Sequence, residues 1–236
     1  IEKSEKVGDE TTLKYRYLNL RNEKLTKNIL MRHKIAKIAR EYFYANDFIE
    51  IETPMMIKST PEGARDYVVP SRIHNGKFYA LPQSPQIYKQ LTMIAGFDRY
   101  IQLARCFRDE DLRADRQPEF TQIDLEMSFV DCDDIMDMAE GFISKLMKET
   151  IDVNIDAPLP RMTFADAMNK YGSDKPDTRF DMLIEDISDW ADKTDFVVFK
   201  SAIADGGAVK AIVAKNAAST YTRKKIDKLT DFAKGI

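Results

Sequence analysis

The chain has 236 residues, of which 44% are hydrophobic and 32% are charged, and its formal net charge is −3 at pH 7. This composition predicts a sizeable core in one large domain or two small ones, and it lacks the basic excess that is typical of nucleic-acid-binding proteins. The apolar runs are too short to cross a bilayer and the first residues lack the pattern of a signal peptide, so we expect a cytoplasmic protein without membrane contact. The two cysteines and two histidines are isolated, which argues against a disulfide framework or a metal site in this chain.

Residues 20 to 47 carry apolar side chains at helical spacing, among them Met31 and Ile35. This pattern predicts a long amphipathic helix, and residues 48 to 53 follow it as a strand that Pro54 ends. An ordinary core helix explains the apolar stripe as well as a subunit interface does. The periodicity alone therefore does not predict a dimer.

A turn is predicted within residues 59 to 67, and a helix is predicted within residues 81 to 91. Ser84 precedes a proline and is expected to cap that helix, which places Gln86 and Lys89 on one helical face. An amide beside an ammonium group could bind the two ends of a small zwitterion. A capped helix with a surface lysine is the alternative.

Residues 101 to 129 alternate in a way that predicts a β-hairpin with two different faces. One face is apolar and is expected to pack on helices. The other face carries Gln102, Ala104, Cys106, Arg108 and Glu110 from the first arm, and Phe120, Gln122, Asp124, Glu126 and Ser128 from the return arm.

The polar face of the hairpin suits a nucleotide. Arg108 could grip phosphate oxygens in a fork, Glu110 could accept hydrogen bonds from an exocyclic amine, and Phe120 could stack on a heteroaromatic ring. A solvated hairpin whose charges pair with one another is the alternative, because surface ion pairs are common and weak. The strict alternation of the two faces favours a binding site.

Beyond the hairpin the sequence predicts two helices and then, from about residue 182, a smaller α+β unit with its own turn at Gly206-Gly207. The expected elements are helices at 133–150, 164–171 and 222–233, and strands at 196–199 and 209–214.

The stretch from Phe107 to Glu110, followed by Arg116 to Phe120, resembles motif 2 of the class II aminoacyl-tRNA synthetases. Most of the chain is similar to the bacterial aspartyl-tRNA synthetases. The resemblance implies an α+β fold with a mostly antiparallel sheet flanked by helices. Residues 1–181 would form part of the catalytic domain, with motifs 1 and 2, and residues 182–236 would form part of the bacterial insertion domain.

The resemblance also implies an activity, namely ATP-dependent conversion of L-aspartate to aspartyl-adenylate and transfer to tRNA(Asp). Arg108 would be the catalytic residue, binding the α-phosphate. The implied ATP-binding residues are Arg108, Asp109, Glu110, Gln117 and Phe120, and the implied aspartate-binding residues are Glu62, Gln86, Lys89, Arg108 and Asp124.

The same resemblance implies a mobile loop and two macromolecular partners. Residues 59 to 67 would be a loop that closes over the amino acid, so Glu62 is expected to be disordered or remote without ligand. The loop from Asp111 to Arg116 would reach toward the acceptor end of tRNA. The helix and strand at 20 to 53 would form a homodimer as motif 1.

The chain departs from the resembled family in one respect that bears on activity. It contains no glycine-rich motif 3, and the residues that would hold Mg2+ beside ATP are expected outside it. We therefore expect little or no activation activity from the chain alone. Two other functions stay open: a noncatalytic binding module derived from a synthetase, and an ammonia-dependent ligase like asparagine synthetase.

Overall fold

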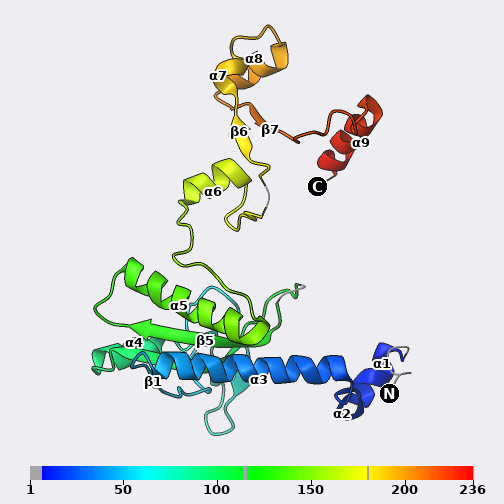
Figure 1. Ribbon diagram of the computed structural model, residues 1–236. Coiled ribbons are helices and arrows are strands. Elements are labelled where there is room, and N and C mark those ends of the chain that lie inside the picture. Colours follow the sequence, from blue (N-terminus) through cyan, green and yellow to red (C-terminus); the bar gives the residue numbers. More distant parts are fainter. Residues whose placement is uncertain (1–6, 114–115, 180, 236) are drawn as a thin grey trace. The chain divides into compact units, whose positions relative to one another are not determined.

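The computed structural model describes residues 7–113, 116–179 and 181–235, and the chain forms two compact units that divide between Leu159 and Pro160 (Figure 1). The sequence placed the boundary later, after residue 181. Residues 160–181 group with the second unit, where helix α6 (Phe164–Tyr171) packs against strand β6 (Ile184–Asp186). The assignment of the units to a catalytic and an insertion domain stays a prediction.

The first unit combines helices with two small sheets, which confirms the predicted α+β class (Figure 1). Its helices are α1 (Asp9–Lys14), α2 (Arg16–Asn19), α3 (Glu23–Tyr44), α4 (Gln86–Ile94) and α5 (Cys132–Ile151). Its strands are β1 (Ile49–Glu50), β2 (Val68–Pro70), β3 (Phe78–Ala80), β4 (Arg99–Phe107) and β5 (Glu119–Met127).

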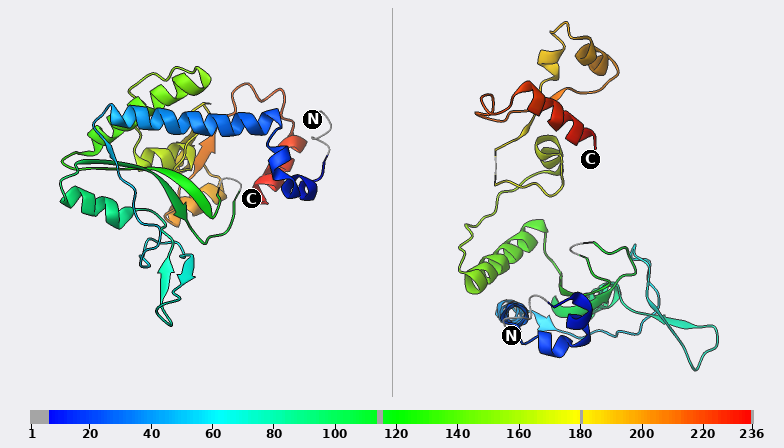
Figure 2. Two further views of the ribbon diagram at one scale, coloured as in Figure 1. Left: turned by 90° about the horizontal axis from the view of Figure 1, so that it is seen from below. Right: turned by 90° about the vertical axis from the view of Figure 1, so that its right-hand side faces the viewer.

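Strands β4 and β5 form the predicted antiparallel hairpin at the centre of this unit. Their register pairs Ile101 with Leu125 and Gln102 with Asp124, and β1 lies parallel to β4 on its other side. A separate antiparallel ribbon of β2 and β3 points away from the sheet (Figure 2).

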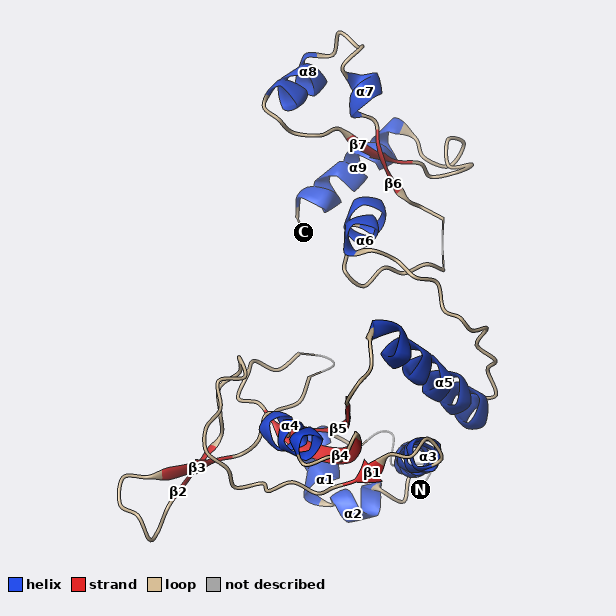
Figure 3. Ribbon diagram, turned by 90° about the vertical axis from the view of Figure 1, so that its left-hand side faces the viewer, coloured by secondary structure: helices blue, strands red, loops and turns tan. Residues whose placement is uncertain are grey.

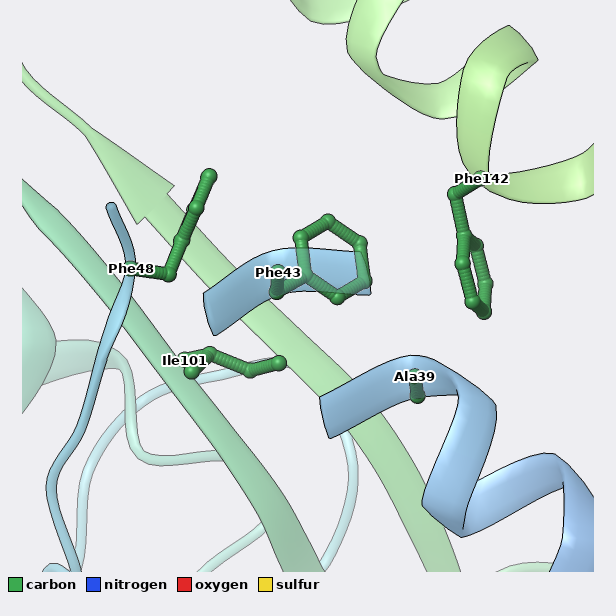
Figure 4. Packing of buried hydrophobic residues seen from close by; sticks show 5 residues of the cluster. All are labelled: Ala39, Phe43, Phe48, Ile101 and Phe142. Carbon is green, nitrogen blue, oxygen red and sulfur yellow. The ribbon is translucent and has the colours of Figure 1, made fainter. Parts of the chain in front are cut away.

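The core lies between one face of the hairpin and the helices α3 and α5, which lie next to each other (Figure 3). Phe43 of α3 sits at its centre, with its ring centroid 5.1 Å from that of Phe48 and 5.0 Å from that of Phe142 (Figure 4). The two helices approach closely because α5 has a glycine, Gly141, where a larger residue would collide with the Tyr42 hydroxyl. This packing turns the opposite face of the hairpin toward α4.

The helix ends of the first unit follow from local sequence. The Asn22 side chain accepts a hydrogen bond from the backbone N–H of Lys24 at the start of α3. Asp131 and Asp134 form a reciprocal capping box at the start of α5. Such caps satisfy backbone donors that the first helical turn leaves unpaired.

The second unit is smaller and its described residues bury little. It contains α6, β6, α7 (Ser188–Ala191), α8 (Val197–Ala204), β7 (Lys210–Ile212) and α9 (Arg223–Lys234). Strands β6 and β7 pair antiparallel. Among its described residues the buried hydrophobic side chains are Ala167, Ala191 and Val209.

One predicted element of the second unit is wrong. Residues 196–199 were expected to form a strand, but they open helix α8. The rings of Phe196 and Phe199 make an edge contact at 4.9 Å, as side chains three positions apart do in a helix. A short apolar run with β-branched residues does not distinguish a strand from a helix, and β7 pairs with β6 instead. The expected strand near 209–214 and the final helix are confirmed as β7 and α9.

Candidate active site

The polar face of the hairpin is divided into a buried end and an open end. At the buried end Gln102, Ala104 and Cys106 of β4 and Asp124 of β5 are all buried, and α4 lies over them. At the open end Arg108 and Phe120 border solvent. Because residues two apart on a strand share a face, both ends belong to one continuous surface.

Lys89 of α4 is the centre of the buried end. The residue is 9% exposed, and its Nζ lies 3.0 Å from Asp124 Oδ1 and 3.2 Å from Glu126 Oε2. It also donates to the carbonyl of Leu125 at 3.3 Å. Burial by itself lowers the pKa of Lys89, but the hydrogen bonds and charges of Asp124 and Glu126 outweigh burial and raise this pKa overall. The lysine is therefore an ammonium held in place.

Asp124 carries an unused acceptor. Its Oδ2 atom is buried and has no hydrogen-bond partner among the described residues, whereas Oδ1 accepts from Lys89. Burial raises the pKa of Asp124, and the hydrogen bond from Lys89 offsets only part of that effect. A buried carboxylate oxygen without a donor is costly, so this atom suits a ligand that brings an ammonium group.

A second row of polar side chains supports the buried end. Gln102 Oε1 accepts hydrogen bonds from the Tyr100 hydroxyl at 2.6 Å and from the Thr53 hydroxyl at 3.0 Å. Burial raises the pKa of the Cys106 thiol to about 11, so that side chain is an inert packing residue. Gln102 and Cys106 were expected on this face from the sequence. Tyr100 and Thr53 were not, although Tyr100 shares the even-numbered side of β4.

The loop at 59–67 meets the start of α4 through Glu62. Ser84 was expected to cap that helix, and this expectation is wrong: Pro85 occupies the N-cap without a side-chain cap. The Ser84 hydroxyl instead donates to Glu62 Oε2 at 2.7 Å. Glu62 was expected to be remote without ligand, yet it is tied to this site. Gln86 is the first residue of α4 and is half-buried, but it lines neither of the two cavities at the open end.

The open end forms a cavity of about 330 Å³. It is lined by Arg108, Glu110, Asp111, Leu112, Arg116, Gln117, Pro118 and Phe120. The Arg108 guanidinium lies 5.1 Å from the centroid of the Phe120 ring, and within the described residues it has no ion-pair partner. Glu110 approaches Arg116 at 3.9 Å.

Asp109 faces a neighbouring cavity of about 360 Å³ that also contains Arg65 and Arg113. The backbones of Asp109 and Arg65 pair at 3.0 Å, and Arg65 Nε donates to the Asp109 carbonyl at 3.2 Å. The expected tRNA-facing loop at 111–116 borders both cavities with its described residues, while residues 114–115 lie outside the described part of the chain.

The structure therefore brings most of the predicted site residues into two groups on one surface. Four of the five predicted nucleotide-binding residues, Arg108, Glu110, Gln117 and Phe120, line one cavity. Lys89 and Asp124 form the buried cluster, which Glu126 completes. Glu126 belonged to the predicted polar face, but its contact with Lys89 was not foreseen.

The described residues contain no ready-made cluster of metal ligands. In residues 7–113, 116–179 and 181–235, no three His, Cys, Asp or Glu side chains are grouped so that they could hold a metal ion. The same part of the chain contains no helix that is both long enough and apolar enough to span a membrane.

Comparison with known families places this surface in context. The family model for class II tRNA synthetases (D, K and N) matches residues 8–229. The chain belongs to this family of class II tRNA synthetases. The arrangement of hairpin, α4 and loop described above thus lies within a synthetase domain.

Relatives within the family carry more specific names. The chain is 60% identical to an aspartate–tRNA ligase of Bacillus licheniformis over 96% of its own length and 38% of the relative's. It is 58% identical to an aspartate–tRNA(Asp/Asn) ligase of Bacillus subtilis over 98% of its length and 39% of that relative's. The chain thus spans about two fifths of the length of these curated relatives.

A solved structure shares the fold. It is the asparaginyl-tRNA synthetase of Pyrococcus horikoshii complexed with asparaginyl-adenylate, with a TM-score of 0.57 and 26% identity. The match covers 65% of this chain and 35% of that one.

Proposed function

We propose that the protein to which this chain belongs activates L-aspartate with ATP and transfers the aspartyl group to tRNA(Asp). The observation that carries the proposal is the buried Lys89–Asp124–Glu126 cluster on the same strand face as the Arg108–Phe120 cavity. The names of the relatives support the choice of aspartate. The adenylate bound to the related asparaginyl enzyme supports an aminoacyl-adenylate as the ligand that joins the two ends. A cytoplasmic location is part of the same proposal.

In this proposal the buried end binds the amino acid. Lys89 receives the side-chain carboxylate of aspartate, and the free Oδ2 of Asp124 receives its ammonium group. Glu62 and Gln86 bind the ammonium from the loop and from the first turn of α4. A neutral asparagine amide would pair poorly with the Lys89 ammonium in a site that excludes water, so aspartate is selected.

The open end would bind ATP. Phe120 stacks on adenine, Glu110 accepts from its exocyclic amine, and Asp109 and Gln117 lie beside the phosphates. A carboxylate oxygen of aspartate bonds to the α-phosphorus while the bond to pyrophosphate breaks, and pyrophosphate leaves with the electron pair. Arg108, which has no ion-pair partner among the described residues, neutralises the charge that develops on the α-phosphate. No protein nucleophile is needed.

Two partners complete the proposal. Arg113 and Arg116 border the second cavity, where they would contact phosphates of the tRNA acceptor end.

A second copy of the chain would pack on α3 and β1, which expose apolar side chains. These are Ile29, Leu30, Tyr44 and Ile49. Sedimentation of the chain across a concentration series tests the dimer.

Calorimetric titration of the chain with a nonhydrolysable aspartyl-adenylate analogue tests the activation proposal, with the asparaginyl analogue as the matched control. We expect the aspartyl analogue to bind at least about tenfold more tightly, because mispairing a buried charge costs about 1.4 kcal/mol or more. Absence of binding would favour the noncatalytic module. Amide formation from aspartate, ATP and ammonia by the whole protein would favour the ammonia-dependent ligase.

A further inference from the structure

Gln83 is a buried amide whose hydrogen-bonding groups are directed at a loop. It is 2% exposed. Its Nε2 donates to the Ala64 carbonyl at 2.9 Å and to Asp66 Oδ1, and its Oε1 accepts from the Ala64 N–H at 3.1 Å. The side chain thus pairs with both backbone groups of Ala64, as a neighbouring strand would.

Ala64 lies at the midpoint of the loop that joins the two ends of the site. On one side of it, the Glu62 carboxylate accepts a hydrogen bond from the Ser84 hydroxyl at the start of α4. On its other side, Arg65 pairs with Asp109 beside the nucleotide cavity. The charge of Glu62 acts on Asp124, where it adds to the dominant effect of burial in raising the pKa. The loop therefore spans the amino-acid end and the nucleotide end.

The backbone around Gln83 is itself fixed. The Leu81 N–H donates to the Tyr67 carbonyl at 2.8 Å, and the Pro82 carbonyl accepts from Phe107 N–H at the end of β4, also at 2.8 Å. A side chain anchored in this way can impose a position on the loop, because its own backbone is attached to the hairpin. Rigid support of this kind is what a precise binding site requires.

We propose that Gln83 is a positioning residue that holds residues 62–66 against the site, so that Glu62 is presented to the amino-acid ammonium and Arg65 to the backbone of Asp109. This inference rests on the proposed function for its ligand. The amide is needed because its neighbours require both a donor and an acceptor. A glutamate at this position would place a carboxylate against the Ala64 carbonyl and the Asp66 carboxylate.

The test compares Gln83→Glu with Gln90→Glu, which makes the same change at an exposed position of α4. We expect Gln83→Glu to speed amide hydrogen exchange in residues 62–66 while the β4–β5 amides exchange as in the unchanged chain. We also expect its affinity for the aspartyl-adenylate analogue to fall at least about tenfold. Gln90→Glu is expected to alter neither measurement.

Rescue separates positioning from a general loss of packing. Asp66→Asn supplies an N–H that can donate to the carboxylate introduced by Gln83→Glu, so the two substitutions combined should recover much of the lost affinity. Gln83→Met has similar length but no hydrogen-bonding group, and it should not be rescued by Asp66→Asn. If Gln83→Glu fails to fold, the Met variant still reports on loop exchange and affinity.

The outcomes distinguish this inference from the function on which it rests. If the unchanged chain does not bind the analogue, the proposed function fails, and the exchange measurement still tests Gln83. If loop exchange in both Gln83 variants equals that of the unchanged chain, the positioning role is overturned. It is likewise overturned if the chain binds the analogue and both variants bind it within about twofold of the same affinity, which is a difference of less than about 0.5 kcal/mol.

Discussion

The two ends of the polar hairpin face use charge in different ways. At the buried end Lys89 is already paired with Asp124 and Glu126 at close range. At the open end Arg108 lies over the Phe120 ring, without an ion-pair partner among the described residues. Buried charges must be compensated before a ligand arrives, whereas a half-buried guanidinium that borders solvent is still solvated by water. Substitutions at the buried end should therefore affect stability as well as binding, and those at the open end should affect binding alone.

Lys89→Met should give the largest loss of stability. It leaves the buried carboxylate of Asp124 without its cation, and breaking a buried pair in this way costs about 3 kcal/mol. Hydrogen exchange of the β4–β5 amides measures the free energy of opening in the first unit. Fluorescence of Trp190, the single tryptophan, reports on the second unit and should not change. The exposed Lys58 provides the matched control, Lys58→Met. A loss below about 1 kcal/mol would contradict the difference between the two ends.

Asp124→Asn should give a smaller, pH-dependent effect. Burial raises the pKa of Asp124 above its ordinary value of 3.8, with the Lys89 hydrogen bond opposing it. A group whose pKa is raised in the folded state contributes stability below its unfolded pKa, and this contribution is lost as pH rises through the folded pKa. The stability of the unchanged chain minus that of the Asn variant should therefore fall as pH rises from about 3.8.

The same exchange experiment, repeated across pH 3 to 7, roughly the range over which carboxyl groups titrate, measures this difference. Carboxyl groups far from Asp124 contribute equally to both proteins and cancel in the subtraction, whereas Glu126 and Glu62, whose charges act on Asp124, contribute to the measured difference. A difference that grows with pH would mean that pairing with Lys89 outweighs burial, and the unused Oδ2 acceptor would then carry less weight in the proposal.

The features that could be predicted from the sequence are local. The hairpin and its faces follow from a period of two, and the apolar set of Ile101 and Leu125 does pack on the core cluster. The predicted cap at Ser84 is wrong because the Ser84 hydroxyl donates instead to Glu62, which is 22 residues away in the sequence. Gln83 was missed for the same reason, since its partner Ala64 is 19 positions distant. Tertiary partners decide where such side chains point.

Arg108→Gln tests the open end. Because the guanidinium borders solvent and no ion pair is broken, stability should change by no more than about 0.5 kcal/mol. Affinity for the aspartyl-adenylate analogue should fall at least about tenfold, since a charged hydrogen bond to phosphate is lost. Arg105→Gln is the control in β4, three positions before Arg108, where the arginine pairs with Glu119 at an exposed position. A marked loss of stability in Arg108→Gln would contradict the expectation that Arg108 contributes to ligand binding and not to the stability of the fold.

Glu110→Gln should give the smallest effect on stability and the most selective effect on binding. Glu110 is exposed and only approaches Arg116 at 3.9 Å, so its charge adds little to folding. As a carboxylate it can only accept hydrogen bonds, which favours a purine with an exocyclic amine over one with a carbonyl oxygen. A glutamine can accept from the amine or donate to the oxygen, depending on the orientation of its amide.

The expected outcome is therefore a loss of discrimination with little loss of affinity. Calorimetry with the adenine and hypoxanthine forms of the aspartyl-adenylate analogue measures this discrimination. Glu110→Gln should bind the adenine form with an affinity within about threefold of that of the unchanged chain, because a neutral hydrogen bond replaces a charged one at an exposed site. The same variant should bind the hypoxanthine form more tightly than the unchanged chain does. If both proteins discriminate equally, the purine amine is read elsewhere, and the open end holds the nucleotide through Arg108 and Phe120 alone.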